Sequence, residues 1–502
     1  MPFAPPATLP RRGVVDLGSN SVRLVVYEGE VRNPTAIFNE KAVLRLGQGL
    51  QETGRLNEDG VAQALLVMHR YHAIARAMRA DPFEVLATAA VRDARNGPEF
   101  VDTLRNRMPH VPITVLSGNE EARMSAAGVL CGIPDARGVL ADIGGGSLEL
   151  VRIDPDGPSA SQTTRLGVIR LAERSGRDLA RARDIVEADL RDVAWLPRAS
   201  GGDLYLVGGA WRALARMHMM HAGHPLHIVH HYTISADHAR AFAELISSIS
   251  RRDLEKMDGA PRRRLDDLPY AAIVLRRLLR HGAVRRIVFS ASGLREGWYM
   301  RGMRADIRAI DPLMETAGEM AERLGRDPAL PSALMRWTDA LFSRDTPGER
   351  RLRRAVCLMS DIGSHDHPEF RAEQAFHRVL RQPSIGLDHG TRAFLALAVA
   401  NRYEIDNNAA YGKAARSLLT PVEAERAETL GSALRLAYTL SGGTQDILAG
   451  STLRVQGKHL ILSLHADSGV FAGEAVTRRL ERLARLATLE PATEAATRRA
   501  AE

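Results

Sequence analysis

Residues 139–151 read VLADIGGGSLELV, and residues 13–25 read GVVDLGSNSVRLV. In both stretches an aspartate ends an apolar run, a glycine turn follows, and a second apolar run begins after a serine. Three pairs of residues match at an offset of 126 (142 minus 16): Asp16 and Asp142, Gly18 and Gly144, Ser21 and Ser147. The repeat predicts two similar α/β halves that face each other across a cleft. Chance similarity over a short window is the alternative.

Strand and helix patterns alternate along the first half of this repeat. Apolar residues keep helical spacing between positions 57 and 80, and residues 83–87 are typical of a strand. A helix is expected to start near Ser117, a favourable N-cap residue, just before the acidic pair Glu120 and Glu121. The alternation predicts an α/β fold.

The composition and the hydrophobic pattern of the sequence change after Met300. The remainder repeats alanine, leucine and arginine in helical patterns, with prolines at the expected helix boundaries. We therefore predict two α/β domains over residues 1–130 and 131–305, followed by an all-helical domain over residues 306–502.

Length and cysteine content narrow the class of protein. A chain of 502 residues predicts several domains, and two cysteines cannot form a disulfide framework, so a reducing cytoplasm is the expected compartment. Residues 1–10 lack a charged segment followed by an apolar one, and no apolar stretch reaches about 18 residues. Neither a signal peptide nor a membrane-spanning helix is expected.

The basic residues are almost all arginine. Lysine occurs at only four positions, so 64 of the 68 basic residues are arginine, whose fork of donors suits phosphate. A codon bias towards arginine explains the same count equally well. The net charge of +8 favours a polyanionic partner without distinguishing nucleic acid, a membrane surface or a chain of phosphates.

Both glycine turns have the composition of a phosphate-binding loop. Backbone N–H groups that no side chain crowds can converge on phosphate oxygens, and the hydroxyls of Ser21 and Ser147 add donors. For either copy alone, an ordinary β-hairpin turn is the alternative.

Acidic residues stand beside both turns. Asp16 and Asp142 each end a strand where a bare carboxylate would repel phosphate, and Mg²⁺ removes this repulsion because it commonly binds one or two carboxylates together with phosphate oxygens. Glu149, on the strand after the second turn, is a third candidate ligand. An aspartate that caps its own turn is the alternative.

Four segments resemble one known family. They occur in the order DLGSNS at 16–21, TAAVRDARN at 88–96, SGNEEAR at 117–123 and DIGGGSLE at 142–149. Together they resemble the exopolyphosphatase / guanosine pentaphosphate phosphohydrolase (Ppx/GppA) family over about residues 12–300. The resemblance implies two actin-like (ribonuclease H-like) halves around a cleft, an HD-like C-terminal domain and a homodimer.

The resemblance also assigns roles to individual residues. Glu121 matches the catalytic glutamate, which acts as a general base or positions the water for in-line attack, and its neighbour Glu120 is expected to face elsewhere. Arg92 matches the arginine that clamps the transferred phosphoryl group. Asp142 and Glu149 match acidic positions that the family needs for activity. The implied phosphate-binding residues are Ser19, Asn20, Ser21, Arg45, Gly144, Gly145, Gly146, Ser147, Gly208 and Gly209.

Three features depart from expectation or are discounted. Ala210 stands where the family usually has threonine. Six histidines between His218 and His231 have spacings suggestive of metal ligands, but Pro225 interrupts any common helix. Residues 359–363, MSDIG, resemble the core of HD phosphohydrolases with serine in place of the metal-binding histidine. We expect a non-catalytic C-terminal domain that helps to bind long substrate or a second subunit.

These observations predict a cytoplasmic exopolyphosphatase that uses Mg²⁺ to hydrolyse the terminal phosphoanhydride of inorganic polyphosphate. Guanosine pentaphosphate (pppGpp) 5′-phosphohydrolase activity is the closest alternative, because the motifs are shared. The presence of Glu121, Arg92, Asp142 and Glu149 argues against a non-catalytic regulator that only binds polyphosphate or the alarmone. The glutamate motif argues against an actin-like ATPase. Neither nucleic acid nor a membrane is an expected partner.

Overall fold

The chain divides into two compact units. The computed structural model describes residues 9–199, 201–282, 284–383, 385–406, 408–465 and 473–496. One unit is Met1–Ile310 and the other is Asp311–Glu502, so the division falls five residues after the predicted boundary (310 against 305).

The first sheet of the N-terminal unit contains the first glycine turn. Its strands are β1 (Arg11–Leu17), β2 (Ser21–Glu28), β3 (Thr35–Val43), β4 (Ala80–Ala87) and β5 (Ile113–Val115), in the order β3-β2-β1-β4-β5. Strand β1 is antiparallel to β2 and parallel to β4.

The second sheet repeats this arrangement with one added strand. It contains β6 (Gly138–Ile143), β7 (Leu148–Asp154), β8 (Gly157–Thr164), β9 (Asp203–Val207), β10 (Tyr232–Ser235) and β11 (Arg286–Phe289), in the order β10-β11-β9-β6-β7-β8. The turns also match in detail, since Gly18 N–H donates to Ser21 O at 3.0 Å and Gly144 N–H donates to Ser147 O at 2.9 Å. The duplication expected from the sequence is therefore present in both topology and turn geometry.

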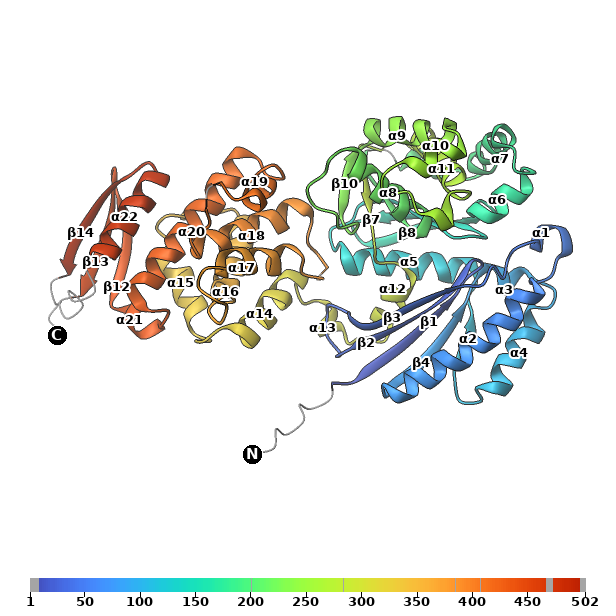
Figure 1. Cartoon of the computed structure of the whole chain (residues 1–502), viewed down its shortest axis with the longest axis horizontal. Coiled ribbons are helices and arrows are strands. Elements are labelled where there is room, and N and C mark those ends of the chain that lie inside the picture. Colours follow the sequence, from blue (N-terminus) through green and yellow to red (C-terminus); the bar gives the residue numbers. More distant parts are fainter. Residues whose placement is uncertain are drawn as a thin grey trace. The chain divides into compact units, whose positions relative to one another are not determined.

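Helices surround these sheets (Figure 1). They are α1 (Leu50–Thr53), α2 (Glu58–Ala77), α3 (Ala89–Asp93), α4 (Gly97–Arg107), α5 (Gly118–Gly132), α6 (Val168–Arg174), α7 (Leu179–Arg191), α8 (Gly209–His221), α9 (Ala236–Ser248), α10 (Arg251–Lys256), α11 (Leu268–His281), α12 (Leu294–Arg301) and α13 (Ala305–Arg308), with 3-10 turns at Leu196–Arg198 and Arg262–Arg264. None of the described helices combines the length and apolar composition that a membrane span requires.

Helix α5 links the two halves. Ser117 caps it and exchanges hydrogen bonds with Glu120. The Glu120 side chain therefore faces the helix start and not the direction of Glu121, as expected from the sequence. Further along α5, Ala122, Ala126 and Val129 pack against apolar residues of the second sheet. The predicted domain boundary at residues 130 and 131 lies inside this helix.

The C-terminal unit is mostly helical. Its helices are α14 (Pro312–Leu324), α15 (Leu330–Thr338), α16 (Pro347–Met359), α17 (Arg371–Leu380), α18 (His389–Arg402), α19 (Ala410–Arg416), α20 (Pro421–Ser441), α21 (Gln445–Ala449) and α22 (Glu474–Leu486). Helix α18 is its most buried element, because nearly every side chain from Ala393 to Arg402 is inside.

The expectation of an all-helical C-terminal domain is corrected by a three-stranded sheet. Its strands are β12 (Ser451–Gln456), β13 (His459–His465) and β14 (Glu490–Ala496), in the order β12-β13-β14. A two-residue turn begins at Gly457, whose φ is 59°, and joins β12 to β13 as a hairpin. The composition of the region concealed this local turn signal.

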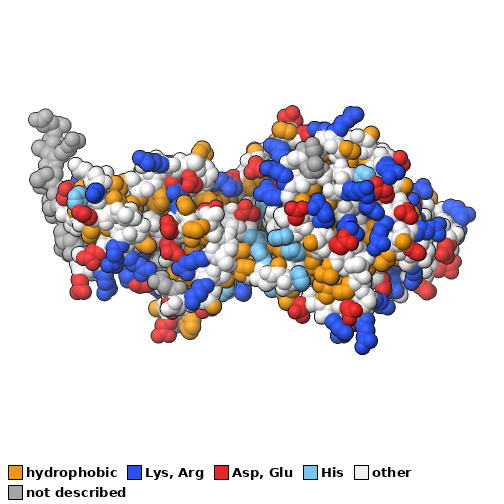
Figure 2. All heavy atoms as spheres, turned by 90° about the horizontal axis from the view of Figure 1, so that it is seen from above, with side chains coloured by type: hydrophobic (Ala, Val, Ile, Leu, Met, Phe, Trp, Pro, Cys, Tyr) orange, Lys and Arg blue, Asp and Glu red, His pale blue; other side chains and the backbone are white. Residues whose placement is uncertain are grey.

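Charged side chains of both signs cover the surface. Figure 2 shows Lys and Arg side chains interspersed with Asp and Glu on the face that it presents. Many arginines are accordingly paired with carboxylates, among them Arg11 with Glu28 and Arg174 with Asp189. Pairs of this kind do not require a polyanionic ligand.

The crossing of α5 and α12 gives a test of the packing that holds the site. A Cβ added at Gly128 would lie 1.9 Å from Gly293 O, and one added at Gly297 would lie 1.8 Å from Met124 O. We expect Gly128→Ala to destabilise the N-terminal unit by about 1–3 kcal/mol, measured by denaturant unfolding.

Gly318→Ala is the matched control. Gly318 is also helical, in α14, and nothing lies within 4 Å of an added Cβ. This substitution should be neutral or stabilise by up to about 1 kcal/mol. Equal effects of the two substitutions would contradict the close helix crossing.

Candidate active site

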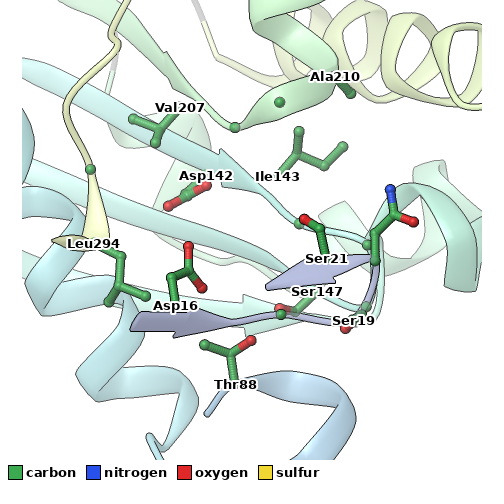
Figure 3. Close-up of a pocket in the computed structure, with 18 of the residues that line it drawn as sticks. Asp16, Ser19, Ser21, Thr88, Asp142, Ile143, Ser147, Val207, Ala210 and Leu294 are labelled. Atoms are coloured by element: carbon green, nitrogen blue, oxygen red, sulfur yellow. The ribbon is translucent and has the colours of Figure 1, made fainter. Parts of the chain in front are cut away.

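A cavity of about 180 Å³ lies where the two glycine turns meet. Strand ends of both sheets reach it, and Figure 3 shows Asp16 and Asp142 projecting into the same space from the two halves. Thirteen of the fifteen residues singled out from the sequence line this cavity: Asp16, Ser19, Asn20, Ser21, Glu121, Asp142, Gly144, Gly145, Gly146, Ser147, Glu149, Gly208 and Gly209.

The two turns are in direct contact. A Cβ at Gly145 would lie 3.2 Å from Ser19 Cβ, and a Cβ at Gly146 would lie 2.8 Å from Ser19 Oγ. Larger residues at these positions would push the halves apart. The glycines therefore allow the loops of both halves to close around one ligand.

Two helices begin at the same cavity. Helix α8 starts after Gly208, and α12 starts after Gly293, and the first residues of both helices line the wall. Helix N-termini present free N–H groups and the positive end of the helix dipole, which together favour an anion. Glu296 accepts from the Gly293 N–H at 2.9 Å at the start of α12, whereas no side chain caps α8, so the start of α8 is the anion-binding wall besides the glycine turns.

Buried carboxylates form one side of the cavity. Asp142 on β6 and Glu149 on β7 are cross-strand partners, and Glu121 reaches the same space from α5. Ser125, one helical turn after Glu121, donates a short hydrogen bond to Asp142. Glu121 and Glu149 are only 6% and 5% exposed, so water does little to screen their charges.

This crowding changes the acidity of the carboxyls. Burial raises the pKa of Glu121 to about 7, with a further upward contribution from Asp142, although Arg92 opposes the change. Burial and the neighbouring Glu121 also raise the pKa of Glu149 well above its usual range. A carboxyl with a pKa of about 7, like that of Glu121, suits proton transfer near neutral pH.

One of the two equivalent positions in the first half carries the opposite charge. Asp16 pairs across the strands with Arg23, which stands where the repeat places Glu149 in the second half (23 plus 126). Arg295 also reaches Asp16, with Nη1 3.0 Å from Oδ2. Two arginines therefore lie near the carboxylate of Asp16, whereas Asp142 and Glu149 bring two carboxylates together in the second half.

None of the five basic residues that line this cavity was expected from the sequence. Arg23, Lys41, Arg212, Arg264 and Arg295 all line it. Partial burial and the neighbouring Arg264 and Arg212 lower the pKa of Lys41 to about 8. A local signal existed for two of them, because Arg212 and Arg295 follow shortly after glycines at helix starts.

Two predicted residues do not line the cavity. Arg92 lies behind Glu121, and its Nη1 donates to Glu121 Oε2 at 3.1 Å and to Leu116 O at 3.0 Å. Arg45 is exposed outside the cavity wall, at a left-handed φ of 53°. A phosphate contact by either guanidinium stays a prediction.

Both discounted clusters have structural uses. His218 Nδ1 lies 2.7 Å from Tyr232 OH, His230 contacts Gly132 O, and among the described residues no group of three His, Cys, Asp or Glu side chains forms a metal site. In the C-terminal unit, the guanidinium of Arg326 contacts both oxygens of Asp361 at 2.9 Å. The carboxylate of the MSDIG segment, Asp361, is thus neutralised by an arginine of the same unit.

Comparison with known proteins follows the division of the chain. The sequence profile described as the Ppx/GppA phosphatase family matches residues 24–305. The chain belongs to this family. A second profile, described as "Exopolyphosphatase, C-terminal", matches residues 313–492 of this Ppx/GppA protein. The family resemblance expected from the four segments is confirmed.

Curated relatives of this Ppx/GppA protein include enzymes and a regulatory protein. Exopolyphosphatase 1 of Mycobacterium tuberculosis is 26% identical over 308 residues, which cover 59% of this chain and 89% of the relative. "Retrograde regulation protein 2" of Saccharomyces cerevisiae is 23% identical over 435 residues, 78% of this chain and 72% of the relative.

Solved structures share the fold. An exopolyphosphatase from Cytophaga hutchinsonii is 22% identical, with a TM-score of 0.53 over 59% of this chain and 99% of that chain. The "PPX-GPPA enzyme" of Aquifex aeolicus is likewise 22% identical, with a TM-score of 0.50 over 58% and 99%. The α/β fold class is thereby confirmed.

The buried acidic cluster predicts a gain in stability when one charge is removed. Because the pKa of Glu149 is raised in the folded state, wild-type stability falls as pH rises from the ordinary glutamate range through that folded pKa. In EDTA at pH 8, we expect Glu149→Gln to raise Tm by roughly 2–4 °C, the change that about 1 kcal/mol produces in a large domain.

The gain should shrink as the pH is lowered towards the ordinary glutamate range and be lost below it, where the wild-type carboxyl is protonated in the unfolded as well as the folded state. Differential scanning fluorimetry across this range measures it. A lower Tm for Glu149→Gln than for the wild type at pH 8 would contradict the inference that Glu149 carries an uncompensated charge.

Proposed function

We propose that this protein is an exopolyphosphatase that uses Mg²⁺ to remove the terminal phosphate of inorganic polyphosphate. The supporting observation is that one cavity is lined by a glutamate with a pKa of about 7, by two glycine turns in contact with each other, and by five basic side chains. The family and its exopolyphosphatase relatives support the same reaction class.

Glu121 is suited to the role of general base. With a pKa of about 7, its carboxylate accepts a proton from water as the water oxygen bonds to the terminal phosphorus. The bond from that phosphorus to the bridging oxygen breaks, which releases orthophosphate and leaves the electron pair on the shortened chain. Arg92 holds one oxygen of Glu121, and the glycine turns and helix N-termini hold the phosphoryl oxygens.

The donor set fits a divalent cation. Oε1 of Glu149 is buried without a hydrogen-bond partner among the described residues, and Asp142 lies beside it on the adjacent strand. Asp16 is already paired with Arg295. We therefore propose that Asp142 and Glu149 bind Mg²⁺ directly and that Asp16 contributes to the site without direct contact with the ion. The metal would neutralise substrate charge and polarise the phosphoryl oxygens.

The lining favours a phosphate chain over a nucleotide. None of the described residues that line the cavity is aromatic, so no ring is available there to stack on a guanine base. Lys41, Arg212 and Arg264 instead supply charge at several points, which a chain with a charge on every unit can use repeatedly. Hydrolysis of pppGpp is the second candidate, because its terminal phosphates would use the same donors.

The proposal extends to compartment and assembly. Cys131 and Cys357 are buried thiols, in agreement with a reducing cytoplasm. A homodimer rests on the family resemblance alone. Neither nucleic acid nor a membrane is proposed as a partner.

Loss of the glutamate tests the reaction. With Mg²⁺ and long-chain polyphosphate, we expect Glu121→Gln to lower kcat for orthophosphate release by about 10²- to 10⁴-fold, because general base catalysis is lost. Glu120→Gln is the matched control and should retain activity within about twofold. Glu121→Gln with near wild-type activity would refute the mechanism, and a higher kcat/KM for pppGpp than for polyphosphate would refute the substrate.

Metal binding has a readout that does not depend on activity. In metal-free buffer, added Mg²⁺ should raise the Tm of the wild type, because a ligand that binds only the folded state stabilises it. The same addition should shift Glu149→Gln by less than half as much. Equal Tm shifts in both proteins would exclude Glu149 as a ligand.

A further inference from the structure

One ion pair joins the two halves beside the candidate catalytic residues. Arg170 of α6 belongs to the second half, and its Nη2 lies 2.8 Å from Oδ2 of Asp93 at the end of α3 in the first half. The Arg170 side chain is only 6% exposed. The Asp93 side chain is 32% exposed, so loss of the contact would leave the guanidinium of Arg170, rather than the carboxylate, buried without its partner.

Asp93 contacts a second guanidinium with its other oxygen. Arg92 Nε lies 3.1 Å from Asp93 Oδ1, and Arg92 Nη1 lies 3.1 Å from Glu121 Oε2. Asp93 therefore stands between an arginine of each half. The interactions form an unbroken series from Arg170 through Asp93 and Arg92 to Glu121.

The other end of this series rests on the second glycine turn. Helix α6 begins against that turn, where Val168 N–H donates to Gly144 O at 3.1 Å and Ile169 N–H donates to Gly145 O at 3.0 Å. Arg170 N–H also donates to Gly145 O at 3.1 Å. A shift of the turn thus moves the backbone that carries Arg170.

A second contact from α6 acts in the same direction. Glu173, three residues after Arg170, accepts a hydrogen bond of 2.8 Å from Gly49 N–H of the first half. Two side chains of one short helix therefore join the halves. Only the Arg170 contact continues to the glutamate.

We propose that Asp93 is a positioning residue that holds Arg92 against Glu121, and that Arg170 makes this alignment depend on contact between the two halves. The inference rests on the proposed function, because it takes Glu121 as the base. When the halves separate, Asp93 loses Arg170 and can rotate, so Arg92 keeps the contacts of Nη1 with Glu121 and Leu116 O but loses the one that holds Nε. The two glycine turns therefore close on phosphate at the same time as Glu121 is brought into alignment.

A double-mutant cycle tests this coupling. We expect Arg170→Met and Asp93→Asn each to lower kcat on polyphosphate by about 10- to 100-fold, with KM changed less than about threefold, since misplacement by about 1 Å is costly in the transition state. The double variant should lose no more than the worse single variant, because both substitutions break one series. Activities are compared below the unfolding transition of each variant.

Arg174→Met is the matched control. Arg174 lies one turn further along α6 and pairs with Asp189 inside the second half, with Nη1 2.6 Å from Oδ2. Loss of this pair should lower Tm while kcat stays within about twofold. If Asp93→Asn does not fold, Arg170→Lys replaces it, and a kcat between those of wild type and Arg170→Met is expected.

Three results would overturn the inference: Arg170→Met with kcat within twofold of wild type, multiplicative losses in the double variant, or an Arg174→Met loss equal to that of Arg170→Met. These failures are distinct from failure of the proposed function. Inactive Glu121→Gln together with active Arg170→Met would refute only the coupling, whereas active Glu121→Gln would refute the function itself.

Discussion

The contact between the two glycine turns is the constraint on which the site depends. Ser19 of the first turn fits against Gly145 and Gly146 of the second, where an added Cβ would lie 3.2 Å from Ser19 Cβ and 2.8 Å from Ser19 Oγ, respectively. This close approach brings the strand ends of two separate sheets to one cavity. The starts of α8 and α12 line the same cavity, so backbone groups of the second half lie beside those of the first glycine turn.

The two halves are alike in backbone and unlike in charge. Asp16 faces Arg23 across its strand pair, whereas Asp142 faces Glu149 in the equivalent pair. One substitution within a duplicated hairpin therefore separates a balanced half from an acidic half. Burial, with a smaller contribution from Asp142, raises the pKa of Glu121 to about 7. The same crowding makes the site costly to fold, which is common where binding and catalysis need buried charge.

The sequence predicted the parts of this molecule that depend on local pattern. The repeat at Asp16 and Asp142 correctly indicated duplicated sheets, and Ser117 correctly marked the start of α5. The hairpin at Gly457 was missed because residues 451–465, whose alternating pattern is typical of strands, were grouped with the helical sequence on either side. Glycine turns and acidic residues were found from their spacing, but Lys41 and Arg264 were not. These two lie far apart in the chain and meet only when β3 and the Arg262–Arg264 turn reach one cavity.

The sequence by itself determined that two strand–turn–strand units exist, that each carries an aspartate, and that Glu121 stands near the start of a helix. Those features follow from nearest neighbours along the chain. Only the tertiary structure decided which charges meet. Arg170 and Asp93 are 77 residues apart, and no local pattern announces their contact. Arginine is abundant throughout the chain, so composition cannot separate the guanidinium groups that line the cavity from those that pair with surface carboxylates. Packing separates them, because burial removes the screening water and makes each remaining charge count.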